Sequence, residues 1–192
     1  MSAPSRIRPA AAALLSLAAV VLAACGSEAS APGVAPDAAA RGKPPAAREL
    51  RALEEESSQL LDGGVAAFEK RLADLEGHPI VVNQWASWCT PCRREFPFFQ
   101  SLADKYRGEV AFLGVDSQDA RPDAEQFLEE LPTPFPHYFD PDVEVARSFG
   151  GGRAWPTTAF YAANGELSFT HQGAYAREAD LDDDIQRYAL GG

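Results

Sequence analysis

Cysteine is scarce in this chain of 192 residues, and the three that occur are Cys25, Cys89 and Cys92. A structural zinc site takes four ligands, normally two cysteine pairs or one pair with two suitably spaced histidines. Only one close pair is present here, and the three histidines stand singly at His78, His137 and His171. We therefore expect no metal site, and we predict that each histidine is a surface or turn residue.

The chain also has few positively charged residues, 17 Lys and Arg against 28 Asp and Glu. Residues 1–24 contain two arginines and no acidic residue, so their removal leaves 15 basic against 28 acidic side chains and a formal net charge of −13. A surface with this excess is repelled by nucleic acid and by anionic lipid headgroups. Nucleic acid is therefore not expected as a partner, and the charge indicates no particular substrate.

The sequence also lacks an apolar run long enough to cross a membrane comfortably. The longest, residues 10–24, has 15 residues where a helical span needs about 20. Arg6 and Arg8 precede it and small residues end it, which is the pattern of a cleaved signal peptide over residues 1–24. The mature protein is then expected outside the cytoplasm.

The end of this signal, "LAAC", resembles the lipobox of bacterial lipoproteins, in which the cysteine is acylated and becomes the first mature residue. The resemblance implies lipidation of Cys25 and a lipid anchor on the bacterial cell membrane, stable when two or more chains are attached. An ordinary secretory signal followed by a chance cysteine is the alternative. An odd cysteine count in an exported protein indicates one unpaired thiol, and lipidated Cys25 would leave Cys89 and Cys92 as a self-contained pair.

Composition divides the rest of the chain into three parts. Residues 25–48 are rich in Ala, Pro, Gly and Ser and cannot bury enough apolar surface to fold, so we predict a disordered tether. Residues 49–76 show helical spacing, with Leu50, Leu53, Leu60 and Leu61 near one stripe, and are predicted to be an N-terminal helical extension. Residues 77–192 are predicted to form the main domain.

Hydrophobic patterning in that domain predicts an α/β fold. Apolar runs at 80–85 and 109–116 are typical of buried strands, and helical patterns follow each of them, at 90–107 and 122–131. A short helix at 143–149, two strands joined around Asn164-Gly165 and a closing helix at 181–190 complete the pattern. We expect a central mixed β-sheet sandwiched by helices.

Cys89 and Cys92 stand three residues apart where the 90–107 helix is expected to begin. A structural disulfide is possible in an oxidising compartment, but closing so short a loop removes little chain entropy. Redox chemistry fits better, since the spacing brings both sulfurs to one face and the free N–H groups of the first turn favour a thiolate at Cys89. Arg93 would either add positive potential or be an ordinary solvated arginine. Glu95, three residues past Cys92, would either exchange a proton with that thiol or be an ordinary surface glutamate.

The sequence resembles the extracytoplasmic thioredoxin-like proteins of the TlpA/ResA/DsbE type over roughly residues 77–190. The residues that carry the likeness are "VVNQWASWCTPCRREFP", "AFLGVD", "WPTTAFY" and "NGELSFTHQG". The resemblance implies that Cys89 is the nucleophile, Cys92 the resolving thiol and Glu95 the glutamate kept beside them. It also implies a cis-proline at Pro156 facing the cysteines, and a groove for an extended substrate chain lined by Trp88, Thr90, Pro91, Trp155 and Thr157.

Two positions depart from the thioredoxin pattern. Cytoplasmic thioredoxins carry a buried aspartate in the strand before the motif, where this chain has Asn83, which cannot accept a proton. The proton-transfer role therefore moves toward Glu95. Gln84 stands where an aromatic residue is usual, which suggests a more polar neighbour there.

These observations predict a membrane-anchored thiol-disulfide oxidoreductase that needs no cofactor beyond its cysteines. The resemblance favours a reductase. It implies exported thiol or disulfide proteins as partners, with apocytochrome c among them, and a membrane electron donor that keeps the protein reduced. An oxidase of secreted proteins is the main alternative. A non-catalytic module that docks a partner or senses redox state, and a metal chaperone, are two others.

Overall fold

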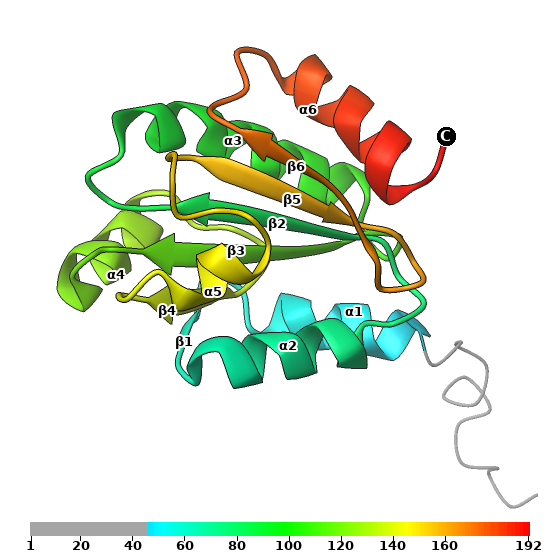
Figure 1. Ribbon diagram of the computed structural model, residues 1–192, viewed down its shortest axis with the longest axis horizontal. Coiled ribbons are helices and arrows are strands. Elements are labelled where there is room, and N and C mark those ends of the chain that lie inside the picture. Colours follow the sequence, from blue (N-terminus) through cyan, green and yellow to red (C-terminus); the bar gives the residue numbers. More distant parts are fainter. Residues whose placement is uncertain (1–45) are drawn as a thin grey trace, which may run out of the picture. The chain divides into compact units, whose positions relative to one another are not determined.

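The computed structural model describes residues 46–192, which build a six-stranded mixed sheet with helices on both faces (Figure 1). The strands lie in the order β1-β4-β3-β2-β5-β6. The first four in that order are parallel to one another, whereas β5 is antiparallel to both β2 and β6. The bounds are β1 Leu60–Leu61, β2 Ile80–Trp85, β3 Ala111–Ser117, β4 His137–Asp140, β5 Thr157–Tyr161 and β6 Leu167–Gln172.

Helices cover the two faces of the sheet with different apolar clusters. The buried cluster on one face combines α1, α2 and α5 with the sheet. Two clusters on the opposite face involve α3, α4, α6 and a π-helix that continues α6. The bounds are α1 Ala46–Glu55, α2 Gly64–Asp74, α3 Thr90–Lys105, α4 Arg121–Glu130, α5 Glu144–Ser148, α6 Glu178–Asp184 and the π-helix Ile185–Ala189. The predicted α/β sandwich is therefore confirmed.

The central strand β2 is buried on both faces, and its side chains alternate between them. Val81 and Trp85 join the clusters on the α3 side, whereas Val82 joins the cluster under α1 and α2. Asn83 falls between Val81 and Trp85 and so points to the α3 side. One polar side chain is thereby placed in an otherwise apolar row, directly beneath α3.

The carboxyl ends of the parallel strands β2 and β3 meet at one edge of the sheet. The loop after β2 leads into α3 and the loop after β3 leads into α4, and the residues before the antiparallel strand β5 arrive at the same edge. In open α/β sheets this edge is where functional groups gather. Segments centred on residues 88, 118 and 155 are thus brought together from distant parts of the sequence.

The prediction for residues 49–76 is wrong in one respect. Helix α1 ends at Glu55, and Leu60–Leu61, which we expected on a helical stripe, form β1 and pair in parallel with His137 and Tyr138 of β4. Two residues are too few to show a strand period, and β4 itself was not predicted. Helix α1 also begins at Ala46, so residues 46–48 belong to a helix and not to the predicted tether.

The helices before β2 share their core with the sheet. Leu50 and Leu53 of α1 and Phe68 of α2 are buried in the same cluster as strand residues of the main domain. The Phe68 ring meets the ring of Tyr138 on β4 edge to face, with centroids 5.5 Å apart. These helices therefore contribute directly to the stability of the sheet that carries the cysteines.

Candidate active site

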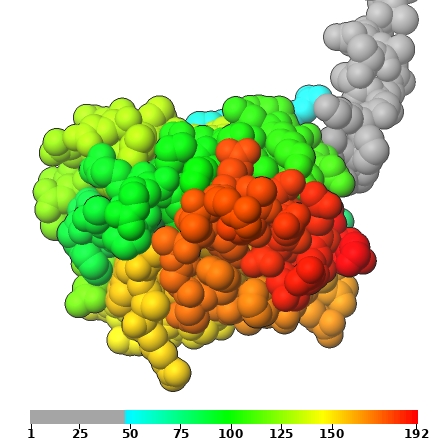
Figure 2. Space-filling view, turned by 90° about the horizontal axis from the view of Figure 1, so that it is seen from above, coloured from blue at the N-terminus to red at the C-terminus, as the bar shows by residue number. Residues whose placement is uncertain are grey.

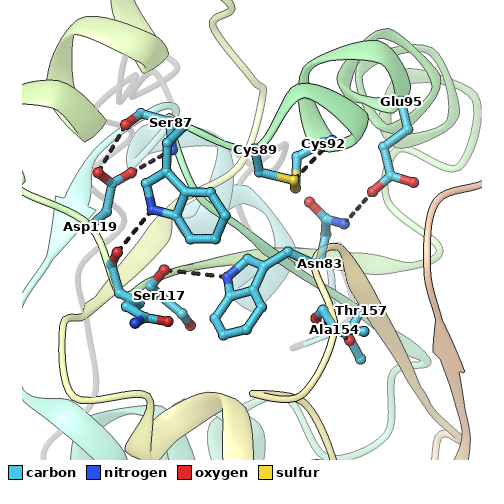
Figure 3. The surroundings of a disulfide bond; sticks show 12 residues. Asn83, Ser87, Cys89, Cys92, Glu95, Ser117, Asp119, Ala154 and Thr157 are labelled. Atoms are coloured by element: carbon cyan, nitrogen blue, oxygen red, sulfur yellow. Dashed lines mark hydrogen bonds between the residues drawn. A yellow bond between two sulfur atoms is a disulfide. The ribbon is translucent and has the colours of Figure 1, made fainter.

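Cys89 and Cys92 form a disulfide at the N-terminus of α3, as their spacing indicates (Figure 3). Cys89 is the N-cap residue, and its sulfur accepts a hydrogen bond from the backbone N–H of Cys92 at 3.2 Å. This bond supplies the first-turn stabilisation expected for a thiolate at Cys89. Cys89 is 3% exposed and Cys92 is 0% exposed, which favours Cys89 as the sulfur that meets a substrate.

Glu95 is wholly buried one turn further along α3 and is not a surface residue. Its Oε1 accepts a hydrogen bond from Asn83 Nδ2 at 2.9 Å, and its Oε2 accepts one from the backbone N–H of Tyr175 at 3.0 Å. Burial raises the pKa of Glu95 to about 7, although both hydrogen bonds act in the opposite direction. A carboxyl group with this pKa can both accept and donate a proton near neutral pH.

The segment before β5 contains the cis peptide bond that the resemblance implies, between Trp155 and Pro156. Thr157 has no exposed surface, and its hydroxyl donates to Ala154 O at 2.9 Å. The prediction that its side chain lines the groove is therefore wrong, because that side chain braces the turn from inside. Trp155 is half-buried and remains at the edge of the site.

Trp88 and Trp155 lie beside each other, with ring centroids 5.6 Å apart. Their indole N–H groups donate to two successive backbone carbonyls where β3 ends and the following loop begins, to Gln118 O at 2.9 Å and Ser117 O at 3.3 Å (Figure 3). Trp88 keeps 55% of its surface exposed. One loop thus holds tryptophans from both the cysteine segment and the proline segment.

The same loop fixes the chain just before the cysteines. Asp119 accepts hydrogen bonds from both the backbone N–H and the hydroxyl of Ser87, the latter at 2.8 Å. Gln118 has a left-handed backbone (φ 60°), which a non-glycine residue seldom adopts. The sequence gives only one sign of this loop, the polar run "DSQD" directly after an apolar strand, and the loop was not predicted.

Thr90 and Pro91 occupy the first turn of α3, where Thr90 is exposed and Pro91 is half-buried. Arg93 does not point at the sulfurs. Its guanidinium pairs with Glu130 at 2.9 Å and lies over the ring of Phe127, 4.5 Å from the ring centroid. The Arg93 guanidinium therefore contacts α4, and no direct contact supports its predicted contribution to the potential at Cys89.

His137 corrects the prediction that each histidine lies at the surface or in a turn. It is fully buried on β4, where its Nδ1 accepts the indole N–H of Trp85 at 3.0 Å and its Nε2 meets Thr133 Oγ1 at 2.7 Å. A Cβ atom on Gly114 of β3 would overlap this ring, so glycine makes room for it. Burial lowers the pKa of His137 to about 3, which keeps the ring neutral.

A second buried acid, Asp116, was missed by the sequence analysis. It is the residue before the last of β3, in register with Trp85, and within residues 46–192 no N–H or O–H donor bonds to either of its carboxyl oxygens. Burial, followed by the negative charge of nearby Asp119, raises the pKa of Asp116 to about 9. An acid at the end of an apolar run is common before a loop, so the sequence alone does not distinguish it from an exposed one.

Gln84 meets the polar neighbour that its position suggests. Its Oε1 accepts a hydrogen bond from the backbone N–H of Gly152 at 2.9 Å, on the face of β2 opposite to Asn83. Gly152 has a left-handed backbone (φ 78°), and Gly151 leaves no space for a Cβ beside the Gln84 amide. Gln84 therefore fastens the segment that leads to Pro156.

Several expectations concern parts of the chain outside this site. Cys25, the signal at 1–24 and nearly all of the tether at 25–48 lie outside the described residues. Within residues 46–192, no three or more His, Cys, Asp or Glu side chains gather so as to hold a metal ion. No helix in that range has both the length and the apolar character needed to cross a bilayer.

Comparison with known proteins agrees with this geometry. The family model described as AhpC/TSA matches residues 57–170. The thiol-disulfide oxidoreductase ResA of Oceanobacillus iheyensis is 36% identical over 105 residues, 54% of this chain and 54% of its own length. The thiol:disulfide interchange protein DsbE of Xylella fastidiosa is 35% identical over 102 residues, which cover 53% of this chain and 50% of its own. The match thus spans about half the length of these relatives.

A solved structure supports the fold. DsbF of Mycobacterium tuberculosis, solved in mixed oxidised and reduced forms, is 29% identical and superposes with a TM-score of 0.55. The superposition covers 59% of this chain and 83% of that one. The predicted thioredoxin-like fold is confirmed, and because the family model matches more than half of the sequence, the chain belongs to the AhpC/TSA family.

Proposed function

We propose that this protein is a thiol-disulfide oxidoreductase whose redox centre is the Cys89–Cys92 pair. The observation that carries the proposal is the disulfide at the N-terminus of α3 with a buried carboxyl group, Glu95, one turn away. The names of the relatives, thiol-disulfide oxidoreductase ResA and thiol:disulfide interchange protein DsbE, support the same activity.

The reaction exchanges one disulfide for another. In the reduced protein, the Cys89 thiolate attacks a substrate disulfide, forms a mixed disulfide and expels one substrate thiolate. Cys92 then loses its proton and attacks the Cys89 sulfur, which expels the second substrate thiolate and leaves the Cys89–Cys92 disulfide. The substrate gains two electrons and the cysteine pair loses two, so the protein needs a separate reductant to begin again.

Glu95 is proposed as the group that takes the proton from Cys92. Cys92 is fully buried, so bulk water does not reach its sulfur directly, and Glu95 is the buried carboxyl group on the same helix. With a pKa of about 7, about half of the Glu95 population is ionised at neutral pH and can act as the base. When a reductant opens the disulfide, the protonated form returns the proton to Cys92.

The substrate chain is proposed to bind in extended form between the cysteine segment and the proline segment. Trp88, Trp155, Thr90 and Pro91 supply side chains around Cys89, and Pro156 ends the opposite wall. The two tryptophans offer apolar surface beside the reacting sulfur, while their polar edges are satisfied by the loop after β3. Such a surface accepts many sequences because it relies on few specific polar contacts.

We further propose that the protein works outside the cytoplasm as a lipoprotein and transfers electrons to exported proteins. The signal pattern at 1–24 and the lipobox cysteine at 25 support the location and the anchor. Disulfides of exported proteins, including apocytochrome c, are the proposed substrates, and a membrane electron donor is the proposed reductant. Residues 25–48 would give the domain reach above the membrane.

The activity is tested by reduction of a protein disulfide with dithiothreitol as the terminal reductant. Cys89→Ser should abolish the catalysed rate, whereas Cys92→Ser should accumulate a mixed disulfide with the substrate. Cys25→Ser is the matched control, because it removes the remaining cysteine and should leave the rate unchanged. A Cys89→Ser protein with the full rate would contradict the proposal.

The direction of electron flow is tested by the reduction potential of the pair. A potential near that of thioredoxin, about −270 mV, would support reduction of exported proteins. A potential near about −120 mV, that of a strong disulfide-forming oxidant, would show that the protein installs disulfides instead. Trapping exported proteins on the Cys92→Ser variant would then identify the substrates in either case.

A further inference from the structure

The connection between β6 and α6 contacts both sides of the redox site. At its start, Gln172 Oε1 lies 3.1 Å from the hydroxyl oxygen of Thr157, and the N–H of Gly173 donates to the carbonyl of Pro156 at 2.9 Å. Two residues later, the N–H of Tyr175 donates to Glu95 Oε2 at 3.0 Å. A segment of four residues thus joins the proline turn to the buried carboxyl group.

The side chain of Tyr175 holds this connection in place. Its hydroxyl donates to Asp184 Oδ2 on α6 at 2.7 Å, and its ring stacks on His171 of β6 with centroids 4.1 Å apart and planes at 18°. The Tyr175 side chain is 6% exposed. A backbone N–H in a loop is held only as firmly as the residue that carries it, and here two neighbouring elements hold that residue.

Helix α6 is in turn fixed against α3, the helix that carries the cysteines. Lys105 pairs with Asp182 at 2.7 Å, and the hydroxyl of Ser101 donates to Glu178 at 3.1 Å. In the space-filling view the orange-to-red C-terminal segment lies directly against the green surface of α3 (Figure 2). Tyr175 is therefore anchored to a helix that is itself held against α3, the helix that carries Glu95.

We propose that Tyr175 is a positioning residue for Glu95. Its hydroxyl bond to Asp184 and its stack on His171 keep its backbone N–H directed at Oε2 of Glu95. The inference deepens the proposed function, because it matters only if Glu95 exchanges a proton with Cys92. No contact between Tyr175 and the substrate is required.

The physical effect of this anchor has a definite sign. A hydrogen bond donated to a carboxylate stabilises its ionised form, so the Tyr175 N–H lowers the pKa of Glu95 against the larger effect of burial. If the anchor loosens, the pKa of Glu95 should rise. The titratable and charged groups around Tyr175 are His171 on β6, Asp180, Asp183 and Asp184 on α6, and Arg187 and Tyr188 on the π-helix, while Cys92 is on the helix that carries Glu95.

The test compares two tyrosines that bind the same helix. Tyr175→Phe removes a 2.7 Å hydroxyl bond to Asp184, and Tyr106→Phe removes a 2.7 Å hydroxyl bond to Asp182 but has no bond to Glu95 or its partners. The readout is the reaction of the reduced protein with an aromatic disulfide such as DTNB. The first thiolate released reports attack by Cys89, and the second reports attack by Cys92.

The rate of the second release should increase with pH, with its midpoint at the pKa of Glu95. We expect Tyr175→Phe to raise that midpoint by roughly 0.5 to 1 pH unit, about the effect of one hydrogen bond. Tyr106→Phe should leave it at the wild-type value. An unshifted midpoint in Tyr175→Phe, or an equal shift in Tyr106→Phe, would overturn the inference.

Two further measurements separate this inference from the proposed function. If Glu95→Gln keeps the wild-type pH profile, Glu95 is not the base and the proposed role of Glu95 fails. If Glu95→Gln loses the profile while Tyr175→Phe keeps it unshifted, only the role of Tyr175 fails. Asp184→Ala removes the acceptor of the Tyr175 hydroxyl and provides a second variant if Tyr175→Phe does not fold. ¹³C NMR titration of the Glu95 carboxyl group gives the midpoint without any assay of activity.

Discussion

Two buried carboxyl groups, Glu95 on the cysteine helix and Asp116 on β3, differ in their hydrogen bonds. Glu95 lies beneath the cysteine helix and accepts one hydrogen bond on each oxygen, from Asn83 and Tyr175. Asp116 lies one residue before the end of β3. Within residues 46–192 no N–H or O–H donor bonds to its oxygens, and its neighbour is another acid, Asp119. Both have no exposed surface, yet the pKa is raised to about 7 in Glu95 and to about 9 in Asp116.

The difference shows that burial alone does not make an acid useful near neutral pH. Asp116 has few favourable partners for its charged form and has Asp119 close by, so it stays protonated at neutral pH and can take up no further proton. Glu95 has two donors that partly offset its burial, so both of its protonation states are populated. The two hydrogen bonds to Glu95 and the negative charge of Asp119 beside Asp116 therefore separate an acid that can exchange a proton near neutral pH from one that stays protonated.

The largest expected effect concerns the rate of exchange. Glu95→Gln keeps the size of the side chain but removes the base, so attack by Cys92 should slow by about 100-fold or more at pH 7. Asp116→Asn should leave that rate within about threefold of the wild type, because Asp116 is already neutral. Stopped-flow measurement of both thiolate releases checks this, and equal losses in the two variants would remove the distinction between the acids.

The next effect concerns stability. A protonated Asp116 stabilises the folded state fully below the unfolded pKa of about 3.9, and this contribution is lost as pH rises toward the folded pKa of about 9. Asp116→Asn carries no such loss, so its free energy of unfolding should exceed that of the wild type by several kcal/mol at pH 7 and by little at pH 3.

Denaturant unfolding at pH 3, 5, 7 and 9 measures this dependence. Glu109→Gln, at an exposed position, is the control and should follow the wild type at each pH. A difference between Asp116→Asn and the wild type that does not change with pH would show that Asp116 titrates normally in the folded protein.

A smaller effect concerns the donor that Asn83 supplies. Asn83→Leu fills a similar volume but offers no N–H to Glu95 Oε1, so the pKa of Glu95 should rise by up to about one unit. The midpoint of the second thiolate release, or the NMR titration of the carboxyl group, reports the change. A midpoint that falls would mean that the amide favours the protonated acid.

The smallest effect is expected at Arg93. The side chains of Arg93 and Glu130 are about half exposed, so Arg93→Gln should lower the free energy of unfolding by no more than about 1 kcal/mol. The pKa of the Cys89 thiol, followed by the absorbance of the thiolate, should stay at the wild-type value. A clear increase would show that Arg93 acts on the sulfur through space.

Local patterns predicted much of the fold and the centre of the site. The apolar runs at 80–85 and 109–116 and the turn at Asn164-Gly165 correspond to strands and a hairpin, because each pattern is long or specific enough to recognise. Cys89, Cys92 and Glu95 share one helix, so their proximity follows from helical spacing alone. The strand at Leu60–Leu61 was missed because its parallel partner lies more than seventy residues away.

The parts of the site that could not be predicted depend on contacts between distant segments. The segment 117–119 lies next to Trp88 and Trp155 only after the sheet has formed. No sequence pattern predicts that the indole N–H groups donate to its carbonyls. His137 and Asp116 are polar side chains with no exposed surface, and residue type alone does not indicate this burial. The contact between Tyr175 and Glu95 spans eighty residues and involves a backbone group, which leaves no trace in residue type.

The central claim is that Glu95 is the proton acceptor for a Cys89–Cys92 exchange centre. The most direct test is the rate of the second thiolate release between pH 5 and pH 9 in the wild type and in Glu95→Gln. The account predicts a midpoint near pH 7 in the wild type and none near pH 7 in the variant. An unchanged midpoint near pH 7 in Glu95→Gln would contradict it.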